Sequence, residues 1–276
     1  MTKLTLTLFT ALSLVTTVGL AQDTSDFRWR GRIERGKEIE IKGINGPVRA
    51  EPASGDEVEV VAVRSARRSD PESVRMVVIE HDDGVTICAL YPDPPYRPGR
   101  WRNSDHDRPN ECVPGDGGNM SVQDNDVKVS FTVRVPAGVD AVLRTVNGSV
   151  RADSLRSYVD AYTVNGSIAI STTADAQAST INGGITASLG SARWKGSLDF
   201  RTLNGSIVIE LPPDVSAELH AQSLNGGRIT ADWPLSRTER GSTMRRRRAT
   251  ATLGRGGAGE LWAQTMNGGI RVVRRE

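Results

Sequence analysis

The stretch Thr163-Val164-Asn165-Gly166-Ser167-Ile168 decides the fold, because near copies of it recur through the second half of the chain. The other copies begin at Thr145, Thr180, Thr202, Ser223 and Thr265, and an outlying copy is Ile44-Asn45-Gly46. From Asn147 onward, successive Asn residues of the copies are 18, 17, 22, 21 and 42 positions apart. Recurrence at such a period is the signature of a repeat protein. The last interval, twice 21, predicts an insertion or a degenerate unit between Asn225 and Asn267.

Short segments in which apolar and polar residues alternate flank each copy. Val159-Asp160-Ala161-Tyr162 precedes one copy, and Ile207-Val208-Ile209 follows another. A period of two is typical of β-strands, and Asn-Gly supplies the two positive-φ positions of a tight turn. The sequence therefore predicts a unit of strand, Asn-Gly turn, strand and loop in about 20 residues.

Two all-β architectures fit these units. One is a β-solenoid, a right-handed β-helix-like stack in which each unit is one coil, and the other is a series of antiparallel β-hairpins. We favour the solenoid because identity holds at several columns: Thr with one Ser, then an aliphatic residue or Met, then Asn without exception. A hairpin turn would accept Asp or Gly, whereas side-chain amides stacked coil upon coil require the same residue each time.

The stacked columns are interpreted as structural. The predicted Asn ladder consists of Asn147, Asn165, Asn182, Asn204, Asn225 and Asn267. Small residues take the inward position of successive units, which predicts a narrow interior: Ala152, Ala161, Ala178, Ala187, Ala221 and Ala263.

The N-terminus predicts export. A charged start at Lys3 precedes the uncharged run 4–20, and small residues precede Ala21, so residues 1–21 are predicted to be a signal peptide cleaved after Ala21. An uncleaved membrane anchor is the alternative, because the run approaches spanning length. Without a second long apolar stretch, no stable membrane span is expected after cleavage. The predicted location is periplasmic, at the cell surface or secreted.

The mature chain, residues 22–276, is predicted to be a single elongated β-repeat domain. Regular repeats fill 139–276, and two loop insertions cover 91–123 and 235–259. The first insertion carries loop acids, including Asp105 and Asp107, of the type that binds calcium. Their spacing matches no EF-hand loop, so we interpret them as solvated acids.

Composition excludes several function classes. The chain has 35 Lys and Arg against 33 Asp and Glu, a net charge of +2, which is not the basic footprint of a nucleic-acid binder. Three His leave little for His-based catalysis or a His-rich metal site. No Ser/His/Asp arrangement, phosphate loop or dinucleotide fingerprint is present. We therefore predict no enzyme activity, no catalytic residue, no metal site and no cofactor.

Two further features of the sequence are candidates for a role. Cys88 and Cys112 are the only cysteines, and a lone pair in an exported protein predicts a disulfide. Two unpaired buried thiols are the alternative. The other feature is the run Arg245, Arg246, Arg247 and Arg248, a candidate contact with an anionic surface such as lipopolysaccharide, phospholipid or teichoic acid. We favour the alternative of a solvated loop or an edge-protecting strand.

The motifs in their order carry a resemblance. They are Phe27-x-Trp29, the segment Arg134-Val135-Pro136-Ala137-Gly138-Val139, the serial Thr-Val-Asn-Gly-Ser-Ile units, and a closing Leu253-Gly254-x-Gly256. Over about residues 27–273 the chain resembles the bacterial putative-adhesin domain family of exported β-repeat proteins. The resemblance implies the repeat fold and adhesion, and it brings no catalytic residues.

The expected function is therefore that of an exported, non-enzymatic cell-envelope protein with a structural or adhesive role through a repetitive β surface. Its expected partners are an envelope polymer, the cell surface or another protein, and not nucleic acid. One alternative is a polysaccharide-active β-helix enzyme. Its candidate acids are Asp153, Asp160, Asp199 and Glu210, which do not repeat a column, and Asp199 and Glu210 are the two to test. Another is an accessory protein of an envelope-stress response.

Overall fold

A computed structural model describes residues 27–93, 108–240 and 247–275 of the chain. The predicted signal peptide at 1–21, Arg245 and Arg246, and the loop acids Asp105 and Asp107 lie outside these described residues. The described part is all-β apart from one 3₁₀ turn, η1 (Pro71–Ser73). It contains no helix long and apolar enough to cross a bilayer.

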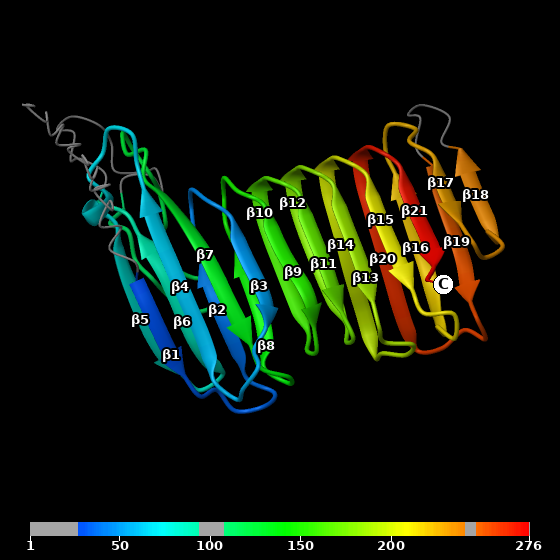
Figure 1. Cartoon of the computed structure of the whole chain (residues 1–276). Helices are drawn as coiled ribbons and strands as arrows, with labels where there is room; N and C mark the ends of the chain where they lie inside the picture. Colours follow the sequence, from blue (N-terminus) through cyan, green and yellow to red (C-terminus); the bar gives the residue numbers. More distant parts are fainter. Residues whose placement is uncertain (1–26, 94–107, 241–246, 276) are drawn as a thin grey trace, which may run out of the picture.

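The strands form two large sheets, which Figure 1 shows as two layers that extend along one axis. The ten-stranded sheet has the order β1 (Phe27–Gly31), β4 (Val58–Ser65), β7 (Lys128–Val135), β3 (Val48–Pro52), β9 (Val150–Leu155), β11 (Ile168–Thr172), β13 (Ile185–Leu189), β15 (Ile207–Leu211), β21 (Ile270–Arg274) and β17 (Ile229–Ala231). The eleven-stranded sheet has the order β18 (Arg237–Arg240), β19 (Arg247–Leu253), β16 (Ala217–Ser223), β20 (Gly259–Asn267), β14 (Gly196–Asn204), β12 (Ala176–Asn182), β10 (Val159–Asn165), β8 (Asp140–Arg144), β2 (Glu38–Lys42), β6 (Gly84–Leu90) and β5 (Arg75–His81).

Neighbouring repeat units pair in parallel. Ala161 of β10 lies opposite Ala178 of β12, and Ile170 of β11 lies opposite Ala187 of β13. The strands before and after an Asn-Gly pair, such as β10 and β11, belong to different sheets. The all-β prediction is confirmed, and the alternative of antiparallel hairpin repeats is wrong for these units.

The order of the units in the sheets differs from their order in the chain. β20 pairs with β14 on one side and β16 on the other, so the last unit of the chain lies between two earlier ones. The interval between Asn225 and Asn267 contains β18 and β19, which form an antiparallel edge. At the opposite end, β2 likewise lies between β6 and β8, and the antiparallel strands β5, β4 and β1 close that end.

The main core is a continuous cluster of buried residues from Ile33 to Val272, and a second, small cluster consists of Cys88, Leu90 and Cys112. Its largest fully buried side chains include Phe131 and Phe200. The inward alanines of the repeats are all buried, as the sequence predicts: Ala152, Ala161, Ala178, Ala187, Ala221 and Ala263. Small inward side chains allow the two sheets to approach closely, and the aliphatic residues of the following strands fill the remaining space.

The Thr column bonds one unit to the next. Thr180 Oγ1 donates to the carbonyl oxygen of Gly166 at 2.9 Å, and Thr202 Oγ1 donates to that of Gly183 at 2.8 Å. Ser223 makes the same bond to Gly268 at 3.0 Å, which explains why Ser replaces Thr there. Only a β-hydroxyl is needed at this column.

The Asn side chains of the units form a hydrogen-bonded series on the surface. Asn165 Nδ2 donates to Asn147 Oδ1 at 2.8 Å, and Asn182 Nδ2 donates to Asn165 Oδ1 at 2.8 Å. The series begins at Asn45 and continues through Asn204, Asn267 and Asn225. Each inner amide both donates and accepts, which a carboxylate cannot do.

In most units the Gly of the repeat serves a purpose other than the expected one. The sequence predicts positive φ at Asn-Gly, and Gly46 and Gly226 do have positive φ, at 126° and 82°. The other five, Gly148, Gly166, Gly183, Gly205 and Gly268, do not. A Cβ atom at Gly183 would instead lie 2.0 Å from the carbonyl oxygen of Gly166. Glycine is required because the backbones of successive units approach each other this closely.

Replacing Asn182 with Ala is expected to lower the free energy of unfolding by about 1–2 kcal/mol. The change removes the bond that Asn182 donates to Asn165 and the one that it accepts from Asn204, both 2.8 Å, and an exposed hydrogen bond is worth about 0.5–1.5 kcal/mol. Urea unfolding measures the loss. Thr186→Ala on β13, an exposed position, is the control and should change stability by less than about 0.5 kcal/mol. Equal effects of the two changes would contradict the prediction.

Asp126 makes the stability of the fold depend on pH in the acidic range. Its carboxylate accepts backbone N–H bonds from Arg67, Arg68 and Ser69, and the bonds from Ser69 contribute most to lowering its pKa to about 2. A carboxyl group whose pKa is lower in the folded state stabilises above its ordinary pKa, here 3.8, and loses that contribution as the pH falls towards 2.

Asp126→Asn is therefore expected to melt below the wild type at pH 7, with a difference that shrinks between about pH 4 and pH 2. Thermal unfolding followed by circular dichroism across this range is the measurement. Asp124→Asn removes a nearby exposed carboxylate that makes none of these bonds, and it should show no such pH-dependent difference. A constant difference for Asp126→Asn at every pH would overturn the assignment.

Candidate functional site

Side chains on the outer face of the eleven-stranded sheet form a continuous cross-strand row. Along β20, Leu261 and Ala263 are buried in the core, so Trp262 and Gln264 point outward. The register of successive strand pairs aligns the row Cys88, Lys42, Arg144, Tyr162, Ser179, Arg201, Gln264, Gln222 and Arg248. We call this set the outer row. Neighbouring strands lie about 4.8 Å apart, so the outer row from Arg144 to Arg248 presents side chains at a nearly constant interval, while Cys88 and Lys42 at its end are buried.

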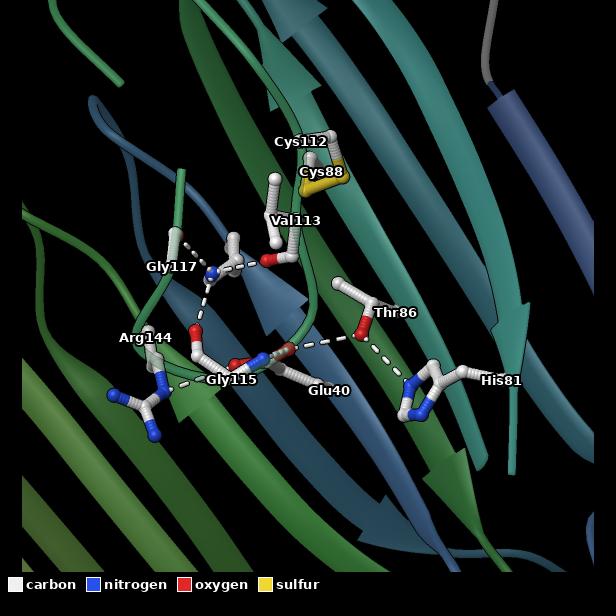
Figure 2. Close-up of a disulfide and its surroundings, with 10 residues drawn as sticks. Glu40, His81, Thr86, Cys88, Cys112, Val113, Gly115, Gly117 and Arg144 are labelled. Carbon is white, nitrogen blue, oxygen red and sulfur yellow. Dashed lines mark hydrogen bonds and ion pairs between the residues drawn. A yellow bond between two sulfur atoms is a disulfide. The ribbon is translucent and has the colours of Figure 1, made fainter. Parts of the chain in front are cut away.

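A segment that we call the strap, residues 109–120, lies over one end of this face. A disulfide joins Cys112 of the strap to Cys88 of β6, with a Cα–Cα distance of 5.9 Å (Figure 2). Asn110 also fixes the strap, because its Nδ2 donates to the carbonyls of Tyr91, Pro92 and Ser121 at 2.9–3.1 Å. The expected bond between the two cysteines is present, and it anchors a segment with little apolar content of its own.

The ammonium group of Lys42, on the β2 strand that the strap covers, forms hydrogen bonds to the backbone of the strap. Its Nζ donates to the backbone carbonyls of Val113 and Gly115, each at 2.5 Å, and of Gly117 at 3.1 Å (Figure 2). The side chain is only 8% exposed, and burial lowers the pKa of Lys42 while the charge of Glu40 opposes that shift. Three carbonyl acceptors match the three N–H donors of a lysine ammonium, so the charge is compensated although it is buried.

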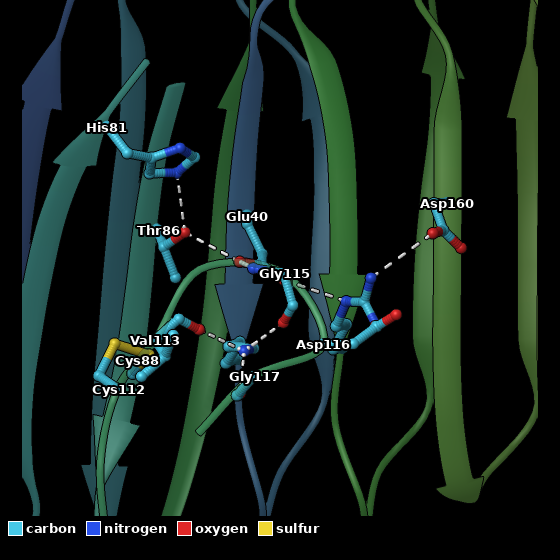
Figure 3. A network of polar contacts seen from close by, with 12 residues as sticks. Glu40, His81, Thr86, Cys88, Cys112, Val113, Gly115, Asp116, Gly117 and Asp160 are labelled. Carbon is cyan, nitrogen blue, oxygen red and sulfur yellow. Dashed lines mark hydrogen bonds and ion pairs between the residues drawn. A yellow bond between two sulfur atoms is a disulfide. The ribbon is translucent and has the colours of Figure 1, made fainter. Parts of the chain in front are cut away.

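Glu40 lies beside Lys42 and is fully buried. Its carboxylate accepts from Thr86 Oγ1 at 2.8 Å and from the backbone N–H of Gly115 at 3.0 Å, and Arg144 Nε lies 3.1 Å from its second oxygen (Figure 3). Because Thr86 gives its one hydroxyl proton to Glu40, His81 Nε2 must donate to Thr86 across their 3.1 Å contact. These partners offset the cost of burying the carboxylate.

Arg144 connects the strap to the open part of the face. Its Nη1 lies 2.6 Å from Asp116 of the strap, and its Nη2 lies 3.7 Å from Asp160 of β10 (Figure 3). Burial raises the pKa of Asp160. A cavity of about 390 Å³ adjoins this arginine, between the strap glycines and Tyr162. Asp116 is thus used in an ion pair, and the described residues contain no group of three or more His, Cys, Asp or Glu that could hold a metal ion.

An aromatic pair occupies the other end of the face. The rings of Trp262 and His220 stack with centroids 4.3 Å apart and planes inclined by 15°. Trp262 Nε1 donates to Glu260 Oε2 at 2.8 Å, and Ser197 Oγ donates to the same oxygen at 3.1 Å. These two bonds, the one from Trp262 first, lower the pKa of Glu260. The carboxylate is therefore charged, and it fixes the orientation of the indole.

A hollow of about 310 Å³ opens beside this pair, and we call it the aromatic hollow. Its lining consists of His220, Ala221, Gln222, Arg248, Ala249, Thr250 and Trp262. Arg248 Nε donates to Gln222 Oε1 at 3.1 Å, which orients both side chains at the rim. The lining contains one guanidinium and no carboxylate, and its volume is at the lower end of the range of about 300–1,000 Å³ found for ligand pockets.

The residues singled out from the sequence lie in separate places. The Asn series follows the turns that connect the two sheets and does not reach the outer face. Arg247 and Arg248 begin β19, paired with Ser223 and Gln222 of β16, and only Arg248 lines the aromatic hollow. Trp262 and His220 were not among the residues expected to have a role, although the alternation along β20 places the indole on the polar side of its strand.

Comparison with known proteins gives two similar solved structures. One is described as a putative cell adhesion protein from Clostridium sporogenes, with 9% identity, a TM-score of 0.44, and coverage of 91% of this chain and 100% of that chain. The other is a putative adhesin from Bacteroides fragilis, with 9% identity, a TM-score of 0.30, and coverage of 91% and 97%. No protein-family model matches the chain, and no curated protein sequence matches it.

Proposed function

We propose that the chain is an exported cell-envelope protein without enzymatic activity, which binds a macromolecule through the outer face of the eleven-stranded sheet. The observation that carries this proposal is the outer row, in which strands in register place side chains at a constant interval. Repeat proteins use such extended regular surfaces to bind large ligands. A polymer with its own repeat could contact several positions of the outer row at once.

The proposal includes the organisation of the chain. Residues 1–21 act as a signal peptide, and 22–276 form one elongated domain in which each repeat is a coil of a β-solenoid. Parallel pairing of units and the hydrogen bonds along the Thr and Asn columns support the solenoid. The disulfide between Cys88 and Cys112 supports an oxidising compartment outside the cytoplasm.

The geometry does not favour the alternative of a polysaccharide-active enzyme. Glycoside hydrolysis requires a pair of carboxyl groups, one of which is protonated before it acts as the acid. Asp199 is paired with Arg201 at 2.9 Å, and Asp160, whose pKa is raised by burial, lies 3.7 Å from Arg144. Asp153, paired with Arg49 at 2.8 Å, and Glu210 lie on β9 and β15 in the opposite sheet. Glu260 has a lowered pKa and holds two donors on one oxygen, so it is not suited to donate a proton.

Co-sedimentation of residues 22–276 with isolated cell envelopes tests the proposal. The wild type should be retained in a saturable manner, and the double variant Tyr162→Ala/Arg201→Ala in the outer row should bind about five-fold more weakly, the equivalent of about 1 kcal/mol. Thr186→Ala/Arg271→Ala changes exposed positions on the ten-stranded sheet and should bind as the wild type does. Absence of wild-type retention, or equal losses for the two double variants, would refute the proposal.

A further inference from the structure

Trp262 is a large aromatic residue whose side chain lies on the outer face of the sheet and does not pack in the hydrophobic core. It lies opposite Asp199 of β14 on one side and opposite His220 of β16 on the other. Its neighbours along the strand, Leu261 and Ala263, are the residues that fill the core. An indole on the outer face of a sheet, only partly covered, marks a surface at which aromatic area is available for contact with a ligand.

The aromatic pair is held in place before any ligand arrives. The stack with His220 restricts the indole on one side, and the bond from its Nε1 to Glu260 fixes its rotation. Ser197 in turn orients the carboxylate of Glu260. A rigid platform binds more tightly than a mobile one, because less conformational freedom is lost on binding.

Several polar groups at the aromatic hollow are available to form hydrogen bonds with a ligand. Arg248 uses its Nε on Gln222, while its Nη groups and the Nε2 of Gln222 have no partner among the described residues. Thr250 adds a hydroxyl, and Arg248 itself is exposed. The lining of the aromatic hollow contains one guanidinium and no carboxylate, and the nearby carboxylate of Glu260 is hydrogen-bonded to Trp262 and Ser197. The aromatic hollow is therefore complementary to an anionic group.

We infer that the aromatic hollow binds a segment of an acidic polysaccharide. The apolar face of a sugar ring would pack on the platform of Trp262 and His220, while a ring carboxylate pairs with the guanidinium of Arg248 in a bidentate manner. Sugar hydroxyls would bond to Gln222 and Thr250, because such directional polar contacts fix the orientation of a ligand in a pocket. The inference rests on the proposed function, since it names the kind of polymer that the outer face binds and the position of its main contact.

Isothermal titration calorimetry with uronate trimers tests the inference. The probes are trimers of galacturonate, mannuronate and guluronate, with maltotriose as the neutral counterpart. At least one uronate trimer should bind while maltotriose binds at least ten-fold more weakly, and Trp262→Ala and Arg248→Ala should each weaken uronate binding at least ten-fold. Thr186→Ala and Arg271→Ala, two exposed positions of the opposite sheet, should stay within two-fold of the wild type.

If Trp262→Ala fails to fold, Arg248→Ala still tests the inference. Arg248 is exposed, so its replacement removes no buried side chain and is expected to leave the fold intact. The inference is overturned if none of the uronate trimers binds, if maltotriose binds as tightly, or if Arg248→Ala binds as the wild type does. Envelope retention separates this result from the proposed function. Retention that survives periodate oxidation of the envelope sugars and is unchanged in Arg248→Ala overturns the inference and leaves the proposed function standing, whereas no wild-type retention refutes the proposed function itself.

Discussion

Replacing Gly183 with Ala is expected to lower the free energy of unfolding by about 3 kcal/mol or more. The added Cβ atom would lie 2.0 Å from the carbonyl oxygen of Gly166 and 2.5 Å from its carbonyl carbon, both backbone atoms that cannot move without separating two repeat units. Separation would also stretch the bond from Thr180 Oγ1 to that carbonyl oxygen. Urea unfolding monitored by circular dichroism measures the loss, and we expect a marked fall in the midpoint.

Gly184→Ala is the matched control, because it makes the same chemical change one residue further along. At Gly184 the nearest atom to a Cβ would be the carbonyl oxygen of Ser206 at 3.4 Å, an ordinary contact. The corresponding positions of other units are Ser149, Ser167 and Ser206, so this column accepts a Cβ atom. The stability of Gly184→Ala should stay within about 0.5 kcal/mol of the wild type. If Gly183→Ala were equally mild, the close stacking of the units would be wrong.

The strands and the repeated columns could be predicted from the sequence, because each column contacts the same column of the next unit. The alternating segment at 159–162 lies in β10 (Val159–Asn165), and the segment at 207–209 lies in β15 (Ile207–Leu211). The role of the repeated Gly could not be predicted. Asn-Gly indicates a positive-φ turn when read as a local pair, whereas the contact that excludes a Cβ atom comes from a neighbouring unit.

The order of the units was also beyond prediction. Asn267 lies between Asn204 and Asn225 in the hydrogen-bonded series, although it is the last copy in the chain. Every unit has the same or closely similar residues at the positions that contact the next unit. Any two units could therefore pair equally well, and the sequence does not show which unit lies beside which. The long insertion between Asn225 and Asn267 permits this order, because it lets the chain return and place its final unit inside the sheets.

The site was harder to predict than the fold, because its polar groups owe their surroundings to distant segments. Glu40 and Lys42 alternate with the core residues Ile39 and Ile41, a pattern that predicts exposed side chains on an outer face. Both are buried because the strap covers them, about 75 residues further along the chain. Trp262 and His220 are 42 positions apart and meet only because β20 is placed beside β16.

Replacing both Cys88 and Cys112 with Ala is expected to lower the free energy of unfolding by about 3 kcal/mol, since the disulfide closes a loop across a sequence separation of 24. For a domain of this size, each kcal/mol corresponds to about 2–4 °C, so the melting temperature should fall by about 6–12 °C. Wild type in reducing agent should melt as the double variant does, and reductant should not affect the variant. A melting temperature that is unchanged by both treatments would contradict the prediction.

The loss should begin locally at the strap, because the contacts that remain there are polar. They include the hydrogen bonds that Lys42 and Asn110 donate and the bond that Glu40 accepts from the backbone N–H of Gly115. The ion pair between Arg144 and Asp116 adds to them. Hydrogen exchange should therefore speed up in residues 110–119 of the Cys88→Ala/Cys112→Ala variant, while exchange in β10 to β15 stays as slow as in the wild type. A general rise in exchange across these repeats would mean that the disulfide supports the whole stack. With the strap loosened, the buried charges of Glu40 and Lys42 would gain access to water, so the disulfide also keeps this end of the outer face closed.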